Sequence, residues 1–429
     1  MNSLVNRFLG VAGLQVISKG LVAVSGVIFA RYLGPVEYGR YAYVMSIVVI
    51  AGLPVVAGLP NLLVREVANY HLVEKWGMLS GVIRWSRWHI LKLSSLIVGL
   101  MILGFYCGIF DSDVMELLWI AIWLIPLRGL LTQQGAILNG LRRPLLSLLP
   151  MQILSPIIVI TLVCLLIFLG VDYKSKDIIL ITIVASFFSF LLSLILLSLV
   201  NKKEIKKSNA QYDKKSWYAS LFPLALVVII TTFNTELAVF FLGWLGGSES
   251  VAFFKVAMQA TVLISLSLSS VNTVIMPNVA RYFKQGDKEK TQELLTKSVR
   301  LSVFVSVPII LLLLFFGDYL INLLFGAEYV EAYSILVVLC VGQFVNIFMG
   351  SVGAVLYMTH NEKKALKSLF IALVINIVLL VLLIPSYLET GAAIATSSSM
   401  IIWNILMAKE VKILTGFKTW FSGWRYHAK

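Results

Sequence analysis

Twelve stretches of this chain are apolar over enough residues to cross a lipid bilayer. A membrane-spanning helix needs about 20 apolar residues to traverse a hydrocarbon core of about 30 Å. Lipid offers the backbone no hydrogen-bond partners, so each stretch is predicted to form an α-helix. The predicted spans are residues 11–31, 41–65, 91–110, 117–139, 145–169, 178–200, 217–243, 251–276, 301–316, 333–358, 368–385 and 391–408.

The scarcity of charged residues supports the same prediction. Of the 429 residues, 59% are hydrophobic and 13% are charged, whereas a soluble globular chain has about 25% charged residues. None of the apolar stretches alternates with polar residues as the strands of an outer-membrane barrel do. We therefore predict an all-α membrane protein with twelve transmembrane helices.

Positive charge falls on alternate sides of these spans. Cytoplasmic loops carry an excess of Lys and Arg, and with the N-terminus placed in the cytoplasm 28 of the 35 Lys and Arg residues lie on the inner side. Only Arg31, Arg40, Lys174 and Lys176 lie on the outer side. The pattern predicts that both termini are cytoplasmic. Attraction to anionic lipid explains the net charge of +14, and no motif points to nucleic acid.

The chain also divides into two related halves. The Lys-rich segment 201–216 separates six predicted spans from six others, and the pattern LGxxE occurs at Leu33–Glu37 and at Leu245–Glu249, 212 residues apart. We predict an N-terminal six-helix lobe over 1–200, a cytoplasmic linker over 201–216, a C-terminal six-helix lobe over 217–408 and a basic tail over 409–429. Lobes repeated in parallel are related by a pseudo-two-fold axis and can give alternating access to a central cavity.

One outer turn resembles a known family. Residues 29–41, FARYLGPVEYGRY, resemble the first outer turn of the polysaccharide transporter family, the Wzx-type O-antigen flippases. Met276-Pro277, Ala280-Arg281 and Gly286-Asp287 add to the resemblance. The superfamily also contains multidrug and toxin extruders and the lipid II flippase.

The resemblance implies a protein of the bacterial inner membrane that is not an enzyme. Its substrate would be an oligosaccharide repeat unit, of O-antigen or a related surface polysaccharide, linked to undecaprenyl-pyrophosphate. Membrane lipids would surround it, and a polysaccharide polymerase and a chain-length regulator are candidate partners.

Three cations lie inside the predicted spans, and they point to a site. Lys19, Arg128 and Lys255 each need a partner or a hydrated cavity, because a charge at mid-bilayer costs about 2.5–3.5 kcal/mol. Arg65 lies near the inner end of the second span. We predict a cationic cavity that binds the pyrophosphate, since cations attract phosphate strongly in a low-dielectric site. The alternatives are interfacial positions for Lys255 and Arg65 and buried ion pairs for the two deeper cations.

Polar side chains accompany these cations at helical spacing. Gln15, Asn61 and Gln259 each lie four residues from a cation and on the same face. Residues 343, 346, 350, 353 and 357 are spaced by three and four, which predicts one helical stripe able to contact sugars; tight helix packing is the alternative. The predicted substrate-binding residues are Lys19, Arg128, Lys255, Arg65, Gln15, Asn61, Gln259, Gln343 and Asn346.

Glu236 is the only carboxylate deep inside a predicted span. With its neighbour Asn234 it is the predicted site of ion coupling, and the alternative is that it balances Lys19 or Arg128. No GxxxxGK[ST] sequence is present, so we expect no ATP hydrolysis by this chain. The three cysteines have no CxxC spacing, and no metal or cofactor is expected.

Three alternative functions remain open at this stage. A multidrug exporter of the same superfamily would bind cationic or neutral drugs, for which acidic groups in the spans are expected. A membrane-embedded polymerase or ligase would need catalytic residues outside, where the longest segment, 317–332, has no obvious catalytic set. A lipid II flippase is expected to have fourteen spans.

Overall fold

The computed structural model describes residues 2–108, 112–200, 208–359 and 361–421, and these residues form helices and short turns without a strand. Ten helical segments in this part of the chain are long and apolar enough to cross a membrane. The prediction of an all-α membrane protein is therefore confirmed. The helices form two compact units, one of residues 1–29 and 40–232 and the other of residues 30–39 and 233–429.

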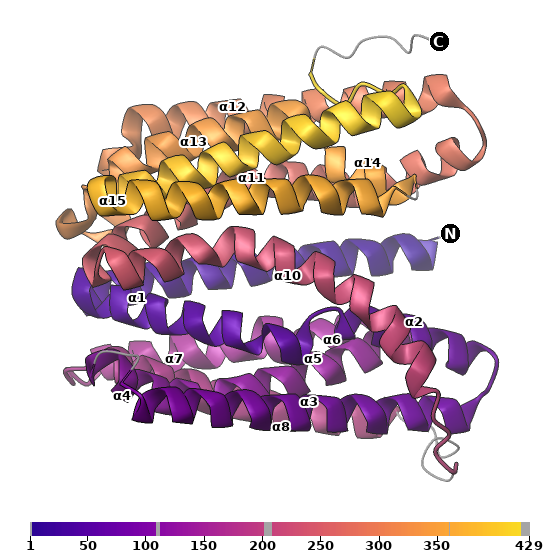
Figure 1. Ribbon diagram of the computed structural model, residues 1–429, viewed down its shortest axis with the longest axis horizontal. Coiled ribbons are helices and arrows are strands. Elements are labelled where there is room, and N and C mark those ends of the chain that lie inside the picture. The colour runs from indigo at the N-terminus through magenta and orange to yellow at the C-terminus, as the bar shows by residue number, and fades with distance from the viewer. Residues whose placement is uncertain (1, 109–111, 201–207, 360, 422–429) are drawn as a thin grey trace. The chain divides into compact units, whose positions relative to one another are not determined.

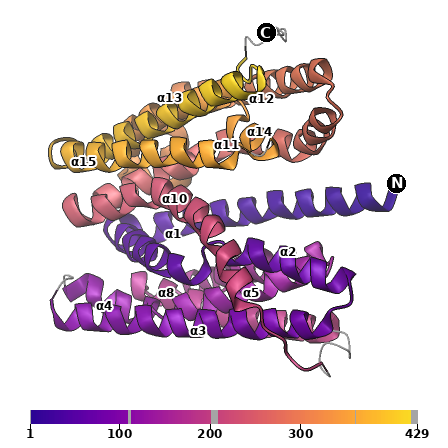
Figure 2. The ribbon, with the colours of Figure 1, turned by 45° about the vertical axis from the view of Figure 1, so that its right-hand side comes forward.

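The first unit is built around one short central helix (Figures 1 and 2). Within it α5 contacts α2, α3 and α8, and α7 packs on α8. A Cβ atom on Gly129 of α5 would lie 3.0 Å from Ile90 and 3.1 Å from Val55, so glycine allows this close packing. The helices are α1 (Asn2–Val56), α2 (Leu59–Leu72), α3 (Trp76–Tyr106), α4 (Ser112–Ala121), α5 (Leu124–Gly140), α6 (Pro144–Leu148), η1 (Leu149–Leu154), α7 (Ser155–Phe168), α8 (Ser175–Val200) and the first part of α10 (Lys214–Leu245).

The second unit is arranged around α13, which contacts α11, α12 and α15. The long helix α15 reverses at Leu388 and forms two arms that run side by side (Figure 1). The helices of this unit are the rest of α10, α11 (Ser248–Lys284), α12 (Lys288–Phe325), η2 (Ala327–Tyr329), α13 (Ala332–Met349), α14 (Val352–Met358) and α15 (Glu362–Thr415).

Both LGxxE segments lie where the chain changes direction. In α1 the backbone leaves the helical conformation at Gly34, which has φ 72° and ψ 170°. Pro35 follows, and a residue before proline is disfavoured in the helical conformation. The second segment separates α10 from α11, with φ 92° at Gly247. Glycine reaches positive φ without strain, so each LGxxE segment allows a reversal between two apolar helices.

Several helices depart from the predicted spans for identifiable reasons. Helix α3 begins at Trp76 rather than at residue 91, because Arg84, Arg87 and Lys92 are exposed on a helix that extends beyond its apolar part. The predicted span 117–139 is divided between α4 and α5. The predicted span 333–358 is divided at Gly350, whose φ is 72°.

The end of the predicted linker packs against α3 within the first unit. Residues 201–207 lie outside the described part of the chain, and Ser208 donates a hydrogen bond to the Trp76 carbonyl oxygen at 3.0 Å. Gln211 N donates to the Gly77 carbonyl oxygen at 3.0 Å. A Cβ atom on Gly81 would lie 1.7 Å from the Gln211 carbonyl oxygen. Glycine at position 81 therefore allows the linker to lie directly on α3.

Replacing Gly81 by alanine is expected to destabilise the protein by about 1–3 kcal/mol, as overpacking does. The added methyl group forces the linker away from α3 and breaks the Gln211–Gly77 hydrogen bond. Thermal unfolding in detergent checks this, with Gly99→Ala as the control on the same helix, because a Cβ atom at Gly99 meets nothing within 4 Å. Equal melting temperatures for the two variants would show that the contact contributes nothing.

Candidate functional site

The cation in α5 has a polar environment inside the first unit. Arg128 lies in the first turns of α5, close enough to Tyr41 of α1 for a direct electrostatic interaction. Tyr41 in turn forms a hydrogen bond with Thr182 of α8. Among the residues that the structure describes, no acidic side chain forms an ion pair with Arg128. Within the described part of the chain, the guanidinium therefore has Tyr41 as a neighbour and no carboxylate that balances its charge.

The other predicted cations of the first unit are more exposed. Lys19 and Gln15 are both exposed on α1, and Asn61 is exposed on α2. Arg65 is also exposed, and its Nη2 lies 2.9 Å from Glu66 Oε1 on the next residue of α2. The Arg65 side chain is 50% exposed, so water screens this ion pair and it contributes little stability. These side chains are accessible in this unit, which a binding role requires.

In the second unit Glu236 has a partner that the sequence did not predict. Glu236 Oε2 on α10 lies 3.6 Å from Lys255 Nζ on α11, with about a quarter of each side chain exposed. Lys255 therefore does not contribute an isolated charge, although the pair is only partly buried. Gln259 is half-buried one turn further along α11.

Asn234 has a structural role that the sequence did not reveal. It is buried, its Nδ2 donates to the Leu369 carbonyl oxygen at 3.4 Å, and its Oδ1 accepts from Ser399 at 3.2 Å. The Ser399 hydroxyl lies 3.0 Å from the Ala372 carbonyl oxygen as well. These contacts join α10 to both arms of α15. Asn234 is thus held by the protein, with Glu236 two residues away.

Asn376 is a candidate that the sequence pattern did not indicate. It lies one turn beyond Ala372 on α15 and is fully buried. Within the described part of the chain neither its Oδ1 nor its Nδ2 has a hydrogen-bond partner. Leaving a buried amide unpaired costs about 1–3 kcal/mol for each group, so such a residue calls for a ligand or a water molecule. In sequence, an asparagine in an apolar helix was the only signal.

The prediction that residues 343, 346, 350, 353 and 357 lie on one continuous helical face is wrong. The chain leaves the helix at Gly350, so Gly353 and Tyr357 lie on α14 while Gln343 and Asn346 lie on α13. Asn346 donates to Gln343 Oε1 at 3.4 Å and accepts from Asn404 at 3.1 Å. These hydrogen bonds favour the packing alternative for the two amides.

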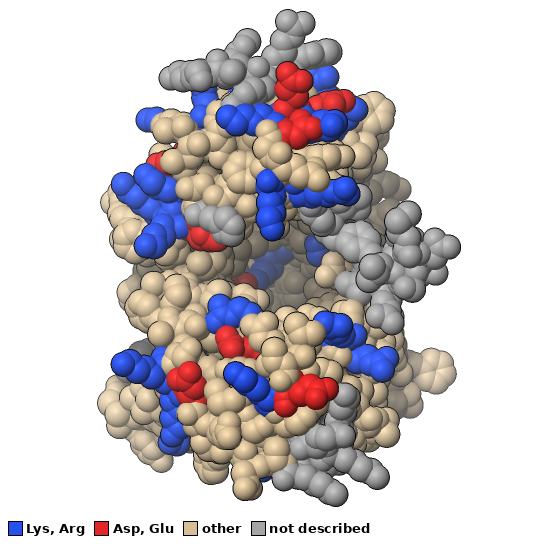
Figure 3. Space-filling view, turned by 90° about the vertical axis from the view of Figure 1, so that its right-hand side faces the viewer, with Lys and Arg blue, Asp and Glu red and all other residues tan. Residues whose placement is uncertain are grey.

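Basic side chains gather at one end of each unit. In Figure 3, Lys and Arg gather around the α2–α3 turn of the first unit and around the α11–α12 turn of the second unit. The exposed residues there include Lys75, Arg84, Lys284 and Lys288. The sequence prediction placed all four on the inner side of the membrane.

Comparison with known proteins identifies the family. Residues 6–283 match the family described as polysaccharide biosynthesis protein, and residues 223–382 match the MatE family. The chain belongs to the polysaccharide biosynthesis protein family. This confirms the resemblance found in the outer turn and in the residues after the eighth span.

Two curated relatives of this family member have names that refer to glycans. This chain is 24% identical over 176 residues to the probable low-salt glycan biosynthesis flippase Agl15 of Haloferax volcanii. The match covers 41% of this chain and 37% of the relative. This chain is 29% identical over 192 residues to the capsular polysaccharide biosynthesis protein CapF of Staphylococcus aureus. That match covers 44% of this chain and 48% of the relative. The matches span less than half the length of either relative.

Solved transporter structures share the fold. The inward closed conformation of the lipid II flippase MurJ has a TM-score of 0.75 with 20% identity, and the match covers 94% of this chain and 87% of that one. An inward-facing multidrug resistance MATE family transporter of the MOP superfamily has a TM-score of 0.77 with 14% identity, covering 92% and 94%. At these identities the comparison establishes the fold alone.

Proposed function

We propose that this membrane protein is a flippase for lipid-linked oligosaccharides. The substrate is an undecaprenyl-pyrophosphate-linked repeat unit of O-antigen or a related surface polysaccharide, moved outward across the inner membrane by alternating access. The observation that carries this proposal is Arg128, a cation within an apolar helical bundle whose charge no described carboxylate balances. A diphosphate supplies the missing negative charge. The names of the relatives Agl15 and CapF favour the same substrate class.

The proposed arrangement contains twelve membrane crossings in two six-helix lobes. The segments 13–72 and 362–415 have 60 and 54 residues, or roughly 90 and 80 Å if straight, which exceeds twice the hydrocarbon thickness. Each has a non-helical residue near its middle, Gly34 and Leu388. If both segments cross twice, the ten apolar helices give twelve crossings. The predicted boundaries at 200 and 217 and the cationic cavity belong to this proposal.

The orientation is tested by cysteine labelling in intact cells. The exposed Cys107 and Cys164 are first replaced by serine. We expect single cysteines at Ser112 and Glu249 to react with an impermeant reagent from the periplasm, because they follow outer turns. Cysteines at Asn209 and Glu362 should react only after the membrane is opened, since they lie among the basic inner segments. Labelling of the second pair in intact cells would contradict a cytoplasmic location of those segments.

The function is tested by deleting the gene in a strain that has no paralogue. We expect surface polymer to disappear and lipid-linked repeat units to accumulate with their glycans facing the cytoplasm. Polymer analysis and accessibility of the glycan to an impermeant glycosidase check this. A plasmid copy should restore the polymer. Normal polymer in the deletion strain would refute the flippase.

A multidrug exporter is the second candidate, because a MATE transporter shares the fold and the MatE family matches residues 223–382. Such an exporter is expected to bind cationic drugs through acidic groups in the membrane. Here the one deep carboxylate, Glu236, is paired with Lys255 at 3.6 Å. A resistance assay separates the two functions, since deletion of an exporter sensitises cells to drugs while the polymer is unaffected.

A further inference from the structure

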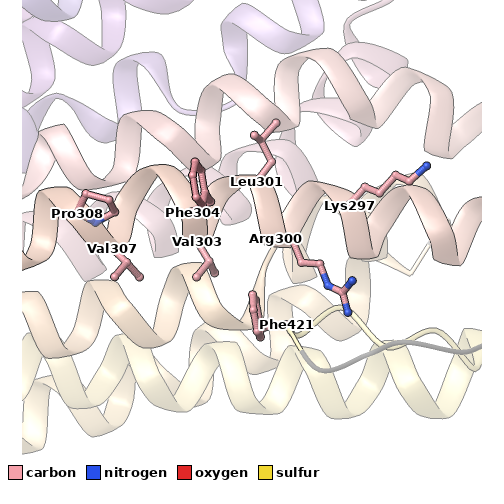
Figure 4. A pocket seen from close by; sticks show the side chains of 8 residues that line it. All are labelled: Lys297, Arg300, Leu301, Val303, Phe304, Val307, Pro308 and Phe421. Carbon is pink, nitrogen blue, oxygen red and sulfur yellow. The ribbon is translucent and has the colours of Figure 1, made fainter.

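The second unit has a groove along an exposed side of α12, next to the C-terminal tail (Figure 4). The groove plays no part in the proposed transport. Its volume is about 780 Å³. Cations lie at one end of the groove and apolar side chains along the rest. The lining residues are Lys297, Arg300, Leu301, Val303, Phe304, Val307 and Pro308 of α12, together with Phe421 of the tail.

The polar end of the groove presents two positive charges. The Arg300 guanidinium lies 5.9 Å from the centre of the Phe421 ring, a contact that leaves its charge unchanged. Lys297 Nζ lies 2.6 Å from Glu293 Oε1, but both side chains are exposed. A pair so exposed is weak and can be exchanged for a stronger anion. No lining residue other than these two cations has a side chain that donates hydrogen bonds.

The apolar end of the groove extends along the helix axis. From Arg300 to Pro308 the helix rises about 12 Å. Phe304 is 79% exposed and Leu301 is 51% exposed. Beyond the groove the same helix continues with the exposed Leu311, Leu312 and Phe315. In a protein with membrane-spanning helices such a surface faces acyl chains, so the groove runs from a charged end into the hydrocarbon region.

The C-terminal tail fixes one wall of the groove. Gln292 of α12 accepts from Lys418 N at 2.9 Å and donates to the Lys418 carbonyl oxygen at 2.8 Å. Phe421 N donates to the Phe348 carbonyl oxygen at 3.0 Å, and the two rings stack with their centres 5.7 Å apart. The wall is therefore held by contacts inside the protein. It does not require a ligand to form.

We propose that this groove binds an anionic phospholipid. Its phosphate contacts Arg300 and Lys297, and one acyl chain lies over Phe304, Val307 and Pro308. A lipid-linked glycan fits less well, because the lining offers a sugar no hydroxyl or amide partner. None of its lining residues belongs to the proposed transport site, so this proposal stands or falls independently of the transported substrate.

The proposal is tested by retention of lipid during purification. Protein is exchanged into an equimolar mixture of phosphatidylglycerol and phosphatidylcholine with identical acyl chains, and bound lipid is counted by native mass spectrometry. We expect phosphatidylglycerol to be preferred, with the preference falling about fivefold for each of Arg300→Gln and Lys297→Gln. The double variant Lys363→Gln and Lys367→Gln is the control, because it removes two exposed lysines of α15 outside the groove.

A second variant tests the groove itself without changing charge. Val307→Trp fills the apolar end and should reduce the amount of phosphatidylglycerol retained. A photo-crosslinking phenylalanine analogue at position 303 should capture a phospholipid in native membranes. Equal retention of the two lipids by the unaltered protein, or capture of an isoprenoid in place of a phospholipid, would overturn the proposal.

Discussion

Replacing Arg128 by glutamate is expected to abolish transport, whereas Arg128→Lys should keep part of it. Arg128 lies near Tyr41, which forms a hydrogen bond with Thr182, and has no carboxylate partner among the described residues. Reversing its charge converts an attraction for the diphosphate into a repulsion. At about 4 Å and an effective dielectric constant near 20, one such interaction amounts to about 4 kcal/mol, or roughly a thousandfold in affinity. Lysine keeps the charge but loses the planar fork of donors.

The measurement is uptake of lipid-linked oligosaccharide by proteoliposomes, with membrane insertion quantified for each variant. Arg143→Glu is the matched control, because Arg143 is an exposed arginine just after the same helix. The Arg143→Glu variant has the same charge reversal at a residue that is not part of the proposed site. Lys19→Glu tests the second deep cation in the same assay. If the Arg128→Glu and Lys19→Glu variants both insert at normal levels and transport normally, the proposal that these cations bind the diphosphate is wrong.

Most of the helical architecture could be predicted from hydrophobic length alone. A bilayer imposes both a minimum apolar length and an internally hydrogen-bonded backbone, so the pattern determines helices directly. The ends were less predictable, because charged residues stop a membrane span without stopping a helix. Helix α3 shows this, since it includes Arg84 and Arg87 before its apolar part begins.

Only some of the internal breaks in the helices could be predicted from the sequence. In the sequence, Gly350 could be one more residue of a helix. In the structure it ends α13 with a positive φ, at a point where the C-terminal tail passes close by. A Cβ atom there would lie 2.6 Å from the Thr419 carbonyl oxygen. The break at Leu388, which has φ 45°, was expected, because it lies between the predicted spans 368–385 and 391–408. Pro385 and Gly391 flank it in the sequence.

The sequence shows which candidate residues are charged or polar, but it does not show which of them form ion pairs or hydrogen bonds. A cation in an apolar helix is visible in sequence, and Arg128, Lys19 and Lys255 were all found in this way. The pairing of Glu236 with Lys255 at 3.6 Å depends on how α10 and α11 are placed within the second unit, which the sequence does not show. Asn376 shows the same limit, because only the surrounding helices decide whether a buried amide finds a partner.

Replacing Glu236 by glutamine is expected to uncouple transport from the ion gradient if this carboxylate carries a proton or a sodium ion. Glutamine cannot ionise, so the variant should move substrate at a rate that no longer depends on the gradient. Lys255 competes with a cation for the same carboxylate, and substrate or ion binding must break the pair for coupling to occur.

The observed ion pair requires a control that separates coupling from folding. If Glu236 only balances Lys255, Glu236→Gln leaves a partly buried cation unpaired and lowers stability, while the double variant Glu236→Gln and Lys255→Gln restores it. If Glu236 carries an ion, the double variant regains stability but stays independent of the gradient. Melting temperature and reconstituted transport are measured for both variants, with the membrane potential, the proton gradient and the sodium gradient varied separately. An ion dependence that survives in the stable double variant would rule out Glu236 as the carrier, because no ionisable group would remain at this position.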